Sequence, residues 1–353
     1  MFLFLKTKKS KNLYRDALLS LSKQIMETIK HGVWTNEAKI NTSIKQVVVN
    51  GMGGSNLGAE IVKSIFNKNL TLPIIIEPGY EVASYVNKET AYIVSSYSGT
   101  TEEPIVAYTK AKQRGAQIIC LTSTGDNALA LLAKKNNTPL FQFPIKANVS
   151  NQPRLGLGAA LTGMIMVLIK LGALKKTILK EIILSSKKLA KVGNALAHSM
   201  NNPARLMANK IKGHEIILVS GPLLAGNMKT LRNQFCESAK NLASYLTVPD
   251  MNHFALEGLK YPKNNSKRLI AVFFESNLDS PKIKTRLHLT KEMYKKNKIK
   301  VISHELKSKG SLDQSLELLQ FGGFLSYYLS IMNHVNPMIV PWVDWFKKEL
   351  ATK

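Results

Sequence analysis

Cysteine is scarce in this chain, with Cys120 and Cys236 the only two among 353 residues. Two cysteines cannot build a disulfide framework, so the sequence favours a reducing compartment. The seven histidines show neither His-x-His nor i,i+4 pairing. No metal site is therefore predicted. Because no Gly-x-Ser-x-Gly elbow occurs either, a serine hydrolase is not favoured.

Long apolar runs are also missing. The segment Phe2–Leu5 is too short for a signal peptide, and no small-residue cleavage site follows it. The most membrane-like segment, residues 155–174, is interrupted by Lys170, glycines and a threonine. It predicts a buried core helix rather than a membrane span. We expect a cytoplasmic protein without a membrane partner.

Acidic residues are few: 23 Asp and Glu stand against 49 Lys and Arg, which gives a net charge of +26 at pH 7. Such an excess can serve nucleic acid, an anionic membrane surface or an acidic substrate. The lysines are scattered, with no Arg-rich tract and no basic–aromatic repeat. We interpret them as a solvated surface that helps to attract an anionic substrate, and nucleic acid is not the expected partner.

Hydrophobic residues make up 45% of the chain, enough for two domains with cores of their own. Apolar runs predict strands at residues 46–50, 72–76, 92–96, 117–122 and 140–143, with helical windows near 56–67, 81–89, 102–114 and 126–135. Strands that are apolar on both faces and alternate with helices predict an α/β fold with a parallel sheet covered by helices.

A second, shorter alternation follows a helical stretch at residues 156–200. It predicts strands at 215–220, 268–274 and 298–303, helices at 229–242, 284–296 and 312–332, and a short helix after Pro337. We therefore expect two domains, residues 1–180 and 181–353. An amphipathic stripe over residues 12–30 predicts a helix that packs on the first domain.

Two loops at the ends of expected strands are the strongest local signals. The run Val47–Asn50 stops at Gly51-Met52-Gly53-Gly54-Ser55, and the segment Ser95–Thr101 is rich in hydroxyl groups. Backbone amides and short hydroxyls at helix N-termini suit a phosphomonoester, whereas the lysine of a nucleotide P-loop is missing. Both loops would lie at the carboxyl edge of one sheet and face one crevice. The alternative is that these residues only cap helices.

Acid–base chemistry is the reaction type that remains for a phosphorylated substrate. Glu237 lies in a helix-compatible segment among apolar neighbours, a setting that suits a general base. The alternative is a solvated glutamate paired with Lys240, and the residues alone do not decide between the two.

Five segments, taken in order, resemble the bifunctional phosphoglucose/phosphomannose isomerases, which are sugar isomerase (SIS) domain proteins of the phosphoglucose isomerase superfamily. The segments are Gly51-Met52-Gly53-Gly54-Ser55, Ser96-Tyr97-Ser98-Gly99-Thr100-Thr101-Glu102, Gln152-Pro153-Arg154, Glu237-Ser238-Ala239-Lys240 and Pro249-Asp250-Met251-Asn252-His253. The resemblance runs from about residue 13 to the end. It implies two SIS-type domains, each a parallel β-sheet flanked by helices in an αβα sandwich.

The resemblance also implies roles for individual residues. The phosphate-binding set would be Gly53, Gly54, Ser55, Ser96, Ser98 and Thr101. Arg154 would stabilise an enediolate, and Glu237 would move a proton between C1 and C2. His253 would assist ring opening from the neighbouring subunit of a homodimer, and Lys347 would face the substrate. The implied reaction converts glucose 6-phosphate, and mannose 6-phosphate as a second substrate, to fructose 6-phosphate without metal or cofactor.

Several positions depart from the family pattern. Thr100 and Ser238 each stand where relatives carry Asn, and Phe254-Ala255 replaces a common Asn-Glu. Residues 338–340 lack the hydroxyl linked to the mannose activity. A second hypothesis is therefore a sugar-phosphate sensor that keeps the fold without catalysis, and nucleic-acid binding is a third.

Overall fold

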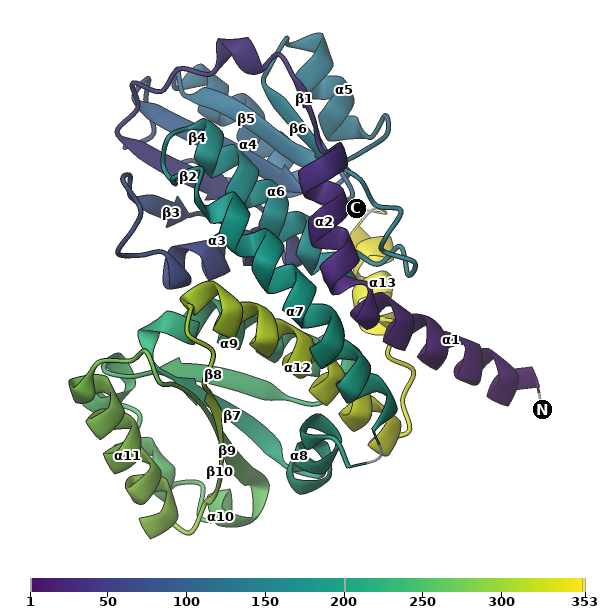
Figure 1. Ribbon diagram of the computed structural model, residues 1–353, viewed down its shortest axis with the longest axis vertical. Helices are drawn as coiled ribbons and strands as arrows, with labels where there is room; N and C mark the ends of the chain where they lie inside the picture. The colour runs from purple at the N-terminus through teal and green to yellow at the C-terminus, as the bar shows by residue number, and fades with distance from the viewer. Residues whose placement is uncertain (1, 200, 351, 353) are drawn as a thin grey trace. The chain divides into compact units, whose positions relative to one another are not determined.

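The computed structural model describes residues 2–199, 201–350 and 352, and it forms two compact units (Figure 1). The first-sheet unit comprises Ser20–Ala190 with Gly310–Leu316. The second-sheet unit comprises the chain up to Leu19, Lys191–Lys309 and the residues from Glu317 onward. The domain boundary expected between residues 180 and 181 falls within helix α7 (Ile178–His198) and remains a prediction.

The first-sheet unit contains a six-stranded sheet in the order β1-β6-β5-β4-β2-β3. Its strands are β1 (Val33–Thr35), β2 (Gln46–Asn50), β3 (Ile74–Ile76), β4 (Thr90–Ser96), β5 (Gln117–Ser123) and β6 (Leu140–Phe143). All pairings are parallel except that of β1 with β6. Because β2 lies between β3 and β4, strand order reverses there. The crevice for a ligand is expected at the carboxyl ends of β2 and β4.

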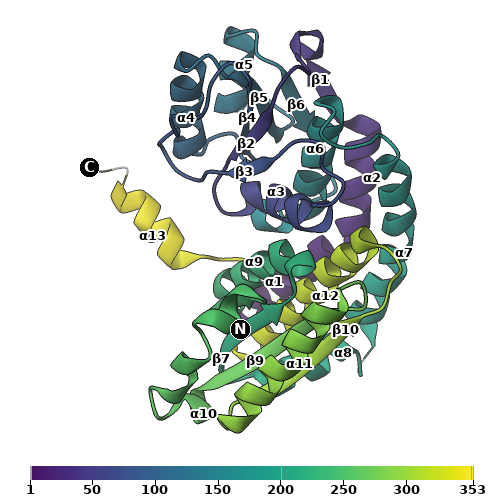
Figure 2. The same cartoon turned by 90° about the vertical axis from the view of Figure 1, so that its left-hand side faces the viewer.

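Helices cover both faces of this sheet (Figure 2). They are α2 (Leu21–His31), α3 (Gly54–Ile65) and α6 (Leu157–Lys170) on one face, and α4 (Glu102–Gln113) and α5 (Ala128–Lys135) on the other. Helix α6 is almost entirely buried, so the prediction of a core helix there is confirmed. No helix among the described residues is long and apolar enough to span a membrane.

The second-sheet unit has four parallel strands in the order β10-β9-β7-β8. The strands are β7 (Glu215–Ser220), β8 (Ala243–Thr247), β9 (Leu269–Ser276) and β10 (Lys300–Leu306). The helices are α1 (Phe2–Leu19), the second part of α7, α8 (Pro203–Ile211), α9 (Ala225–Gln234), α10 (Asn265–Arg268), α11 (Pro281–Lys296), most of α12 (Ser311–Met332) and α13 (Pro341–Leu350). This strand order repeats the order β5-β4-β2-β3 of the first sheet.

The helix expected at residues 81–89 does not form. Val82 and Val86 are buried in the apolar cluster on the α4–α5 face, and their spacing produced the helical pattern. The segment folds as turns because the Asn87 side chain accepts from Glu89 N–H (2.8 Å), and Asn87 N–H donates to Thr90 Oγ1 (3.1 Å). Such local side-chain bonds compete with a helix.

The stripe at residues 12–30 belongs to two helices and not to one. Helix α1 ends at Leu19, and its Leu18 carbonyl accepts from Gln320 Nε2 (2.9 Å) in the second-sheet unit. Helix α2 begins at Leu21, and its Gln24 Nε2 donates to the Leu155 carbonyl (2.9 Å) in the first-sheet unit. The expectation that the whole stripe packs on the first domain is therefore wrong, since its apolar residues serve two cores.

Candidate functional site

The β2–α3 loop carries the glycine cluster. Gly53 precedes α3 with φ 51° and ψ −121°, a conformation that only glycine adopts without strain. Apart from Gly53 itself and its two chain neighbours, no described residue has an atom within 4 Å of the place of a Cβ at Gly53. The backbone conformation, and not lack of space, therefore requires glycine. The turn ends with Ser55 N–H donating to the Met52 carbonyl (3.0 Å) at the start of α3.

The β4–α4 loop is held by its own hydroxyl groups. Ser96 is fully buried, accepts from Gly99 N–H (3.1 Å) and donates to Thr101 Oγ1 (3.0 Å). Ser98 is exposed and accepts from the Thr100 hydroxyl (3.0 Å). Helix α4 starts directly after Thr101, and the Thr101 side chain makes no capping bond. Ser96 thus shapes the loop, whereas Ser98 lies at its surface.

The two loops are joined by direct hydrogen bonds. Tyr97 N–H donates to Ser55 Oγ (2.9 Å), and Ser95 Oγ donates to the Ser55 carbonyl (2.8 Å). A Cβ on Gly51 would lie only 2.8 Å from the Ser95 carbonyl oxygen. The close approach of the loops therefore depends on glycine at this position as well.

Arg154 lies beside the glycine loop. It is in the short 3₁₀ turn η2 (Pro153–Leu155), and its backbone Cα is 3.7 Å from the place of a Cβ on Gly54. Arg154 Nη1 donates to Gln152 Oε1 (2.8 Å). The first-sheet unit thus brings together the start of α3 and the backbone of the arginine-bearing turn, while the anion-binding role of these residues remains a prediction.

The sequence did not single out the residues that hold this turn against the loops. Asn148 is buried, and its Nδ2 donates both to Tyr97 Oη and to the Gln152 carbonyl (each 2.9 Å). Burial raises the pKa of Tyr97, and the bond from Asn148 opposes that rise. A Cβ on Gly156 would lie 2.1 Å from the Tyr97 ring. The presence of Gly156 shortly after Gln152-Pro153-Arg154 was the one feature of the sequence that could have indicated this close contact.

Glu237 lies in η4 (Phe235–Ala239), a π-helical turn that continues α9. Turns of this type are frequent at functional sites. Glu237 is half-buried beside the buried residues Phe235 and Ser238. The Lys240 ammonium donates to the Glu237 backbone oxygen (2.6 Å).

Ser238, one of the departures from the family pattern, faces the core. It is fully buried, and its Oγ accepts from Tyr14 Oη (2.8 Å). Tyr14 is itself fully buried and stacks on Tyr327, with ring centroids 5.9 Å apart. Serine in place of asparagine at position 238 therefore affects the packing of the core next to Glu237.

His253 ends the short turn η5 (Asp250–His253), which follows the carboxyl end of β8, and its side chain is exposed. Asn252 anchors this turn on α11 by donating to Thr290 Oγ1 (2.8 Å) and accepting from Arg286 Nη1 (3.3 Å). The neighbouring Phe254 is 58% exposed. Lys347 is likewise exposed, on α13. The roles expected for Glu237, His253 and Lys347 remain predictions.

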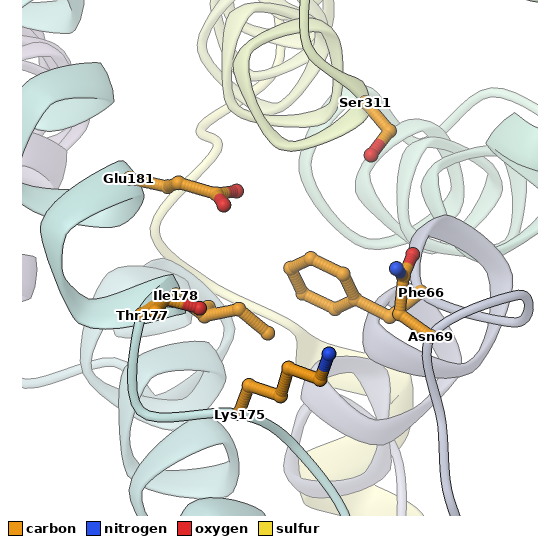
Figure 3. Close-up of a pocket in the computed structure, with 7 residues that line it drawn as sticks. All are labelled: Phe66, Asn69, Lys175, Thr177, Ile178, Glu181 and Ser311. Atoms are coloured by element: carbon orange, nitrogen blue, oxygen red, sulfur yellow. The ribbon is translucent and has the colours of Figure 1, made fainter.

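Two hollows lie away from these loops. The pocket in Figure 3 has a volume of about 130 Å³ and is lined by Phe66, Asn69, Lys175, Thr177, Ile178, Glu181 and Ser311. Phe66 follows the C-terminus of α3, at the opposite end from the glycine loop. A hollow of about 420 Å³ in the second-sheet unit, lined in part by Lys210, Lys212 and Lys300, adjoins the amino ends of its strands. Neither belongs to the candidate site.

Comparison with known proteins covers both units. The SIS domain family matches residues 42–143, and the family described as the bacterial phospho-glucose isomerase C-terminal SIS domain matches residues 200–350. A bifunctional phosphoglucose/phosphomannose isomerase from Caldicellulosiruptor bescii is 26% identical over 95% of this chain and 98% of its own. One from Aquifex aeolicus is 26% identical over 90% and 94%.

Solved structures share the fold. A hypothetical protein from Thermus thermophilus superposes with a TM-score of 0.71 at 13% identity, covering 98% of this chain and 94% of its own. The C-terminal domain of glucosamine-fructose-6-phosphate aminotransferase from Francisella tularensis gives a TM-score of 0.66 at 13% identity, with 93% and 96% covered. The predicted architecture of two SIS domains is confirmed, as is the resemblance drawn from the five segments.

Proposed function

From a chain of two SIS domains that matches bifunctional phosphoglucose/phosphomannose isomerases over nearly its whole length, we propose an aldose–ketose isomerase. Its substrates are glucose 6-phosphate and mannose 6-phosphate, and their common product is fructose 6-phosphate. We place the reaction in the cytoplasm, where the net charge of +26 helps to attract a dianionic substrate.

The observation that carries the proposal is the pair of loops joined through Ser55 and Tyr97 (2.9 Å), with the Arg154 turn beside Gly54. Backbone amides at the start of α3 and hydroxyls before α4 can surround phosphate oxygens. Such a cradle binds the unreactive end of the substrate. Its position at the carboxyl ends of β2 and β4 is where doubly wound sheets bind ligands.

The proposed chemistry is proton transfer. The Glu237 carboxylate removes the proton from C2 of the open-chain aldose and returns it at C1, and the Arg154 guanidinium offsets the negative charge that develops on the enediolate oxygens. His253 assists ring opening, and Lys347 contacts the substrate. Because the enediolate no longer distinguishes the two C2 epimers, one base can serve both aldose phosphates.

We further propose a homodimer in which His253 reaches the site of the neighbouring subunit. Its support is the family resemblance, together with the exposure of His253 and of the large side chains Phe254 (58%) and Tyr261 (59%) near it. An exposed turn held on α11 by Asn252 (2.8 Å) suits an interface.

The sensor hypothesis rested on altered residues beside Glu237 and His253. The burial of Ser238 and its bond with Tyr14 (2.8 Å) weaken this argument, because that departure points into the core. A sensor would bind fructose 6-phosphate without exchanging the C2 proton of glucose 6-phosphate with solvent. A catalyst exchanges it.

The test is a coupled assay with each aldose phosphate in turn. We expect Glu237→Gln to lower kcat by about 10²–10⁴-fold, the contribution typical of a general base, with little change in KM. Glu292→Gln, which removes a carboxylate paired with Lys295 (2.8 Å) on α11 of the same unit, is the matched control and should leave kcat unchanged. Full activity of Glu237→Gln would overturn the assignment of the base.

Removal of divalent cations with EDTA tests whether the enediolate charge is balanced by Arg154 or by a metal ion. Turnover should persist in EDTA, because the guanidinium is expected to balance the enediolate charge. Loss of turnover in EDTA that returns when a divalent cation is restored would contradict this mechanism.

A further inference from the structure

Lys240 bridges two segments that are distant in the sequence. Its ammonium donates to the backbone oxygens of Glu237 (2.6 Å), Asn336 (3.0 Å) and Ile339 (2.6 Å). An ammonium has three N–H donors, and the carbonyls match that number. The Glu237 oxygen lies at the C-terminal end of the π-helical turn, where carbonyls lack helical donors and attract a cation.

A second side chain reinforces this bridge. Asn333 Nδ2 donates to the Ala239 carbonyl (3.1 Å) and to Asn241 Oδ1 (3.5 Å). The connection between α12 and α13 is therefore bonded at Asn333, Asn336 and Ile339 to the residues that follow the proposed base. We call these bonds the Lys240–Asn333 clamp.

The clamp lies at the base of α13, the C-terminal helix in yellow in Figure 1. The structure describes all of Pro341–Leu350, and none of these residues is buried. Trp342 is 80% exposed and Phe346 is 59% exposed. Because α13 has no buried side chain to fix it, its position depends mainly on the hydrogen bonds made by the segment that precedes it.

We propose that Lys240 is a positioning residue that couples the Glu237 turn to the start of α13. The proposal rests on the proposed function for the role of Glu237, while the coupling itself is structural. If the ammonium is removed, the segment before α13 loses its bonds at Asn336 and Ile339, and the Glu237 carbonyl loses the bond from Lys240. The effect should reach the proton-transfer step because Glu237 and Lys240 lie in the same short segment.

The decisive variant is Lys240→Met, which keeps an unbranched side chain as far as the Cε position but has no donor. Lys240 has a positive φ of 51°, which strains any residue that carries a Cβ. Methionine also carries a Cβ, so the substitution leaves this backbone strain unchanged. The control is Lys284→Met in the same unit. It removes a single bond from a lysine ammonium to a backbone oxygen, that of Asn277 (2.8 Å). Lys240→Arg restores a cation with several donors.

Two readouts are compared on the full-length protein. Hydrogen exchange of peptides covering residues 333–350 should become about tenfold faster in Lys240→Met and stay unchanged in Lys284→Met, because the clamp limits local opening. The value of kcat should fall by about 10–100-fold with a smaller change in KM, the scale expected when a reacting group shifts by about 1 Å. Lys240→Arg should recover part of both losses.

The outcomes separate the two proposals. Unchanged exchange in Lys240→Met refutes the clamp, whatever the activity. Faster exchange with unchanged kcat refutes the coupling to Glu237. If the unmodified protein shows no isomerase activity, the proposed function fails, and faster exchange of residues 333–350 still supports the anchoring of α13.

Discussion

The two sheets share one strand order but end in different chemistry. In the first sheet, the residue after the central strand β2 is Gly51, and it meets the Ser95 carbonyl of a loop rich in hydroxyls. In the second sheet, the residue after the corresponding strand β7 is Gly221, and a Cβ there would lie 2.6 Å from Asp279 Oδ2. The position after the equivalent strand is therefore lined by hydrogen-bond donors in the first unit, whereas in the second unit the carboxylate of Asp279 fills it.

Asp279 makes the second crevice unsuitable for an anion. It is 8% exposed, and its Oδ2 has no hydrogen-bond partner among the described residues. Burial raises the pKa of Asp279, and the negative charge of Glu275 adds to that rise. A hydrogen bond with the Ser276 backbone and the charge of Lys284 lower the pKa, so that the net shift is upward. Since a fold does not dictate a site, we infer that the second unit contributes chemistry from the neighbouring π-helical turn instead of a second phosphate cradle.

The largest expected effect that tests this division is on substrate binding. Changing Ser98 to Ala and Thr101 to Val together should raise KM about 100-fold or more, because each hydroxyl would lose a bond to a charged phosphate worth about 1.5–3 kcal/mol. The value of kcat should change little, in contrast to Glu237→Gln. Steady-state kinetics on glucose 6-phosphate measure both.

The matched control lies in the corresponding loop of the second unit. Ser280 is the N-cap of α11 and accepts from Ile283 N–H (3.4 Å). Ser280→Ala should lower stability by about 1 kcal/mol, as the loss of a cap does, and leave KM unchanged. A comparable rise in KM from Ser280→Ala would mean that both crevices bind phosphate.

The next effect concerns the space at Gly221. Its φ of −72° suits alanine, so the expected cost of Gly221→Ala arises only from the contact with Asp279. We expect the free energy of unfolding to fall by about 2 kcal/mol, within the range for overpacking. Urea denaturation measures this change.

A double-mutant cycle shows whether the contact is the cause. Adding Asp279→Ala should remove most of the cost of Gly221→Ala, because the two positions interact directly. Additive effects of the two substitutions would contradict the view that Asp279 occupies the crevice.

The smallest expected effect is that of the Asp279 charge on stability. Because its pKa is raised in the folded state, ionisation favours the unfolded chain, and the cost is fully present above the folded-state pKa. Asp279→Asn should therefore raise the free energy of unfolding by about 1 kcal/mol at neutral pH, the low end of the cost of an unsatisfied buried group.

The pH dependence provides the check. The advantage of Asp279→Asn should shrink as the pH falls through the raised pKa towards the ordinary value for aspartate, since the wild-type carboxyl group then becomes neutral. Asp126→Asn, which affects an exposed residue paired with Lys134 (2.6 Å), should show no such gain. An advantage that does not vary with pH would rule out the charge as its cause.

Most of the fold could be read from local patterns. Buried parallel strands such as β2 and β4 are continuous apolar runs, and the glycine and hydroxyl loops follow them directly in the sequence. The short antiparallel strand β1, the strand β8 and the helix α8 were missed. Residues 81–89 were misread, since Val82 and Val86 are spaced as on a helix but are buried by turns.

The candidate site was foreseeable only in part. The sequence by itself determined which residue types stand at the strand ends, because turn geometry and helix starts are local properties. Tertiary structure decided that Ser238 faces Tyr14, that Asp279 fills the space beside Gly221, and that the Lys240 ammonium bonds to the Ile339 carbonyl. These partners lie far apart in the chain, and no local preference encodes which distant groups the topology brings within hydrogen-bond distance.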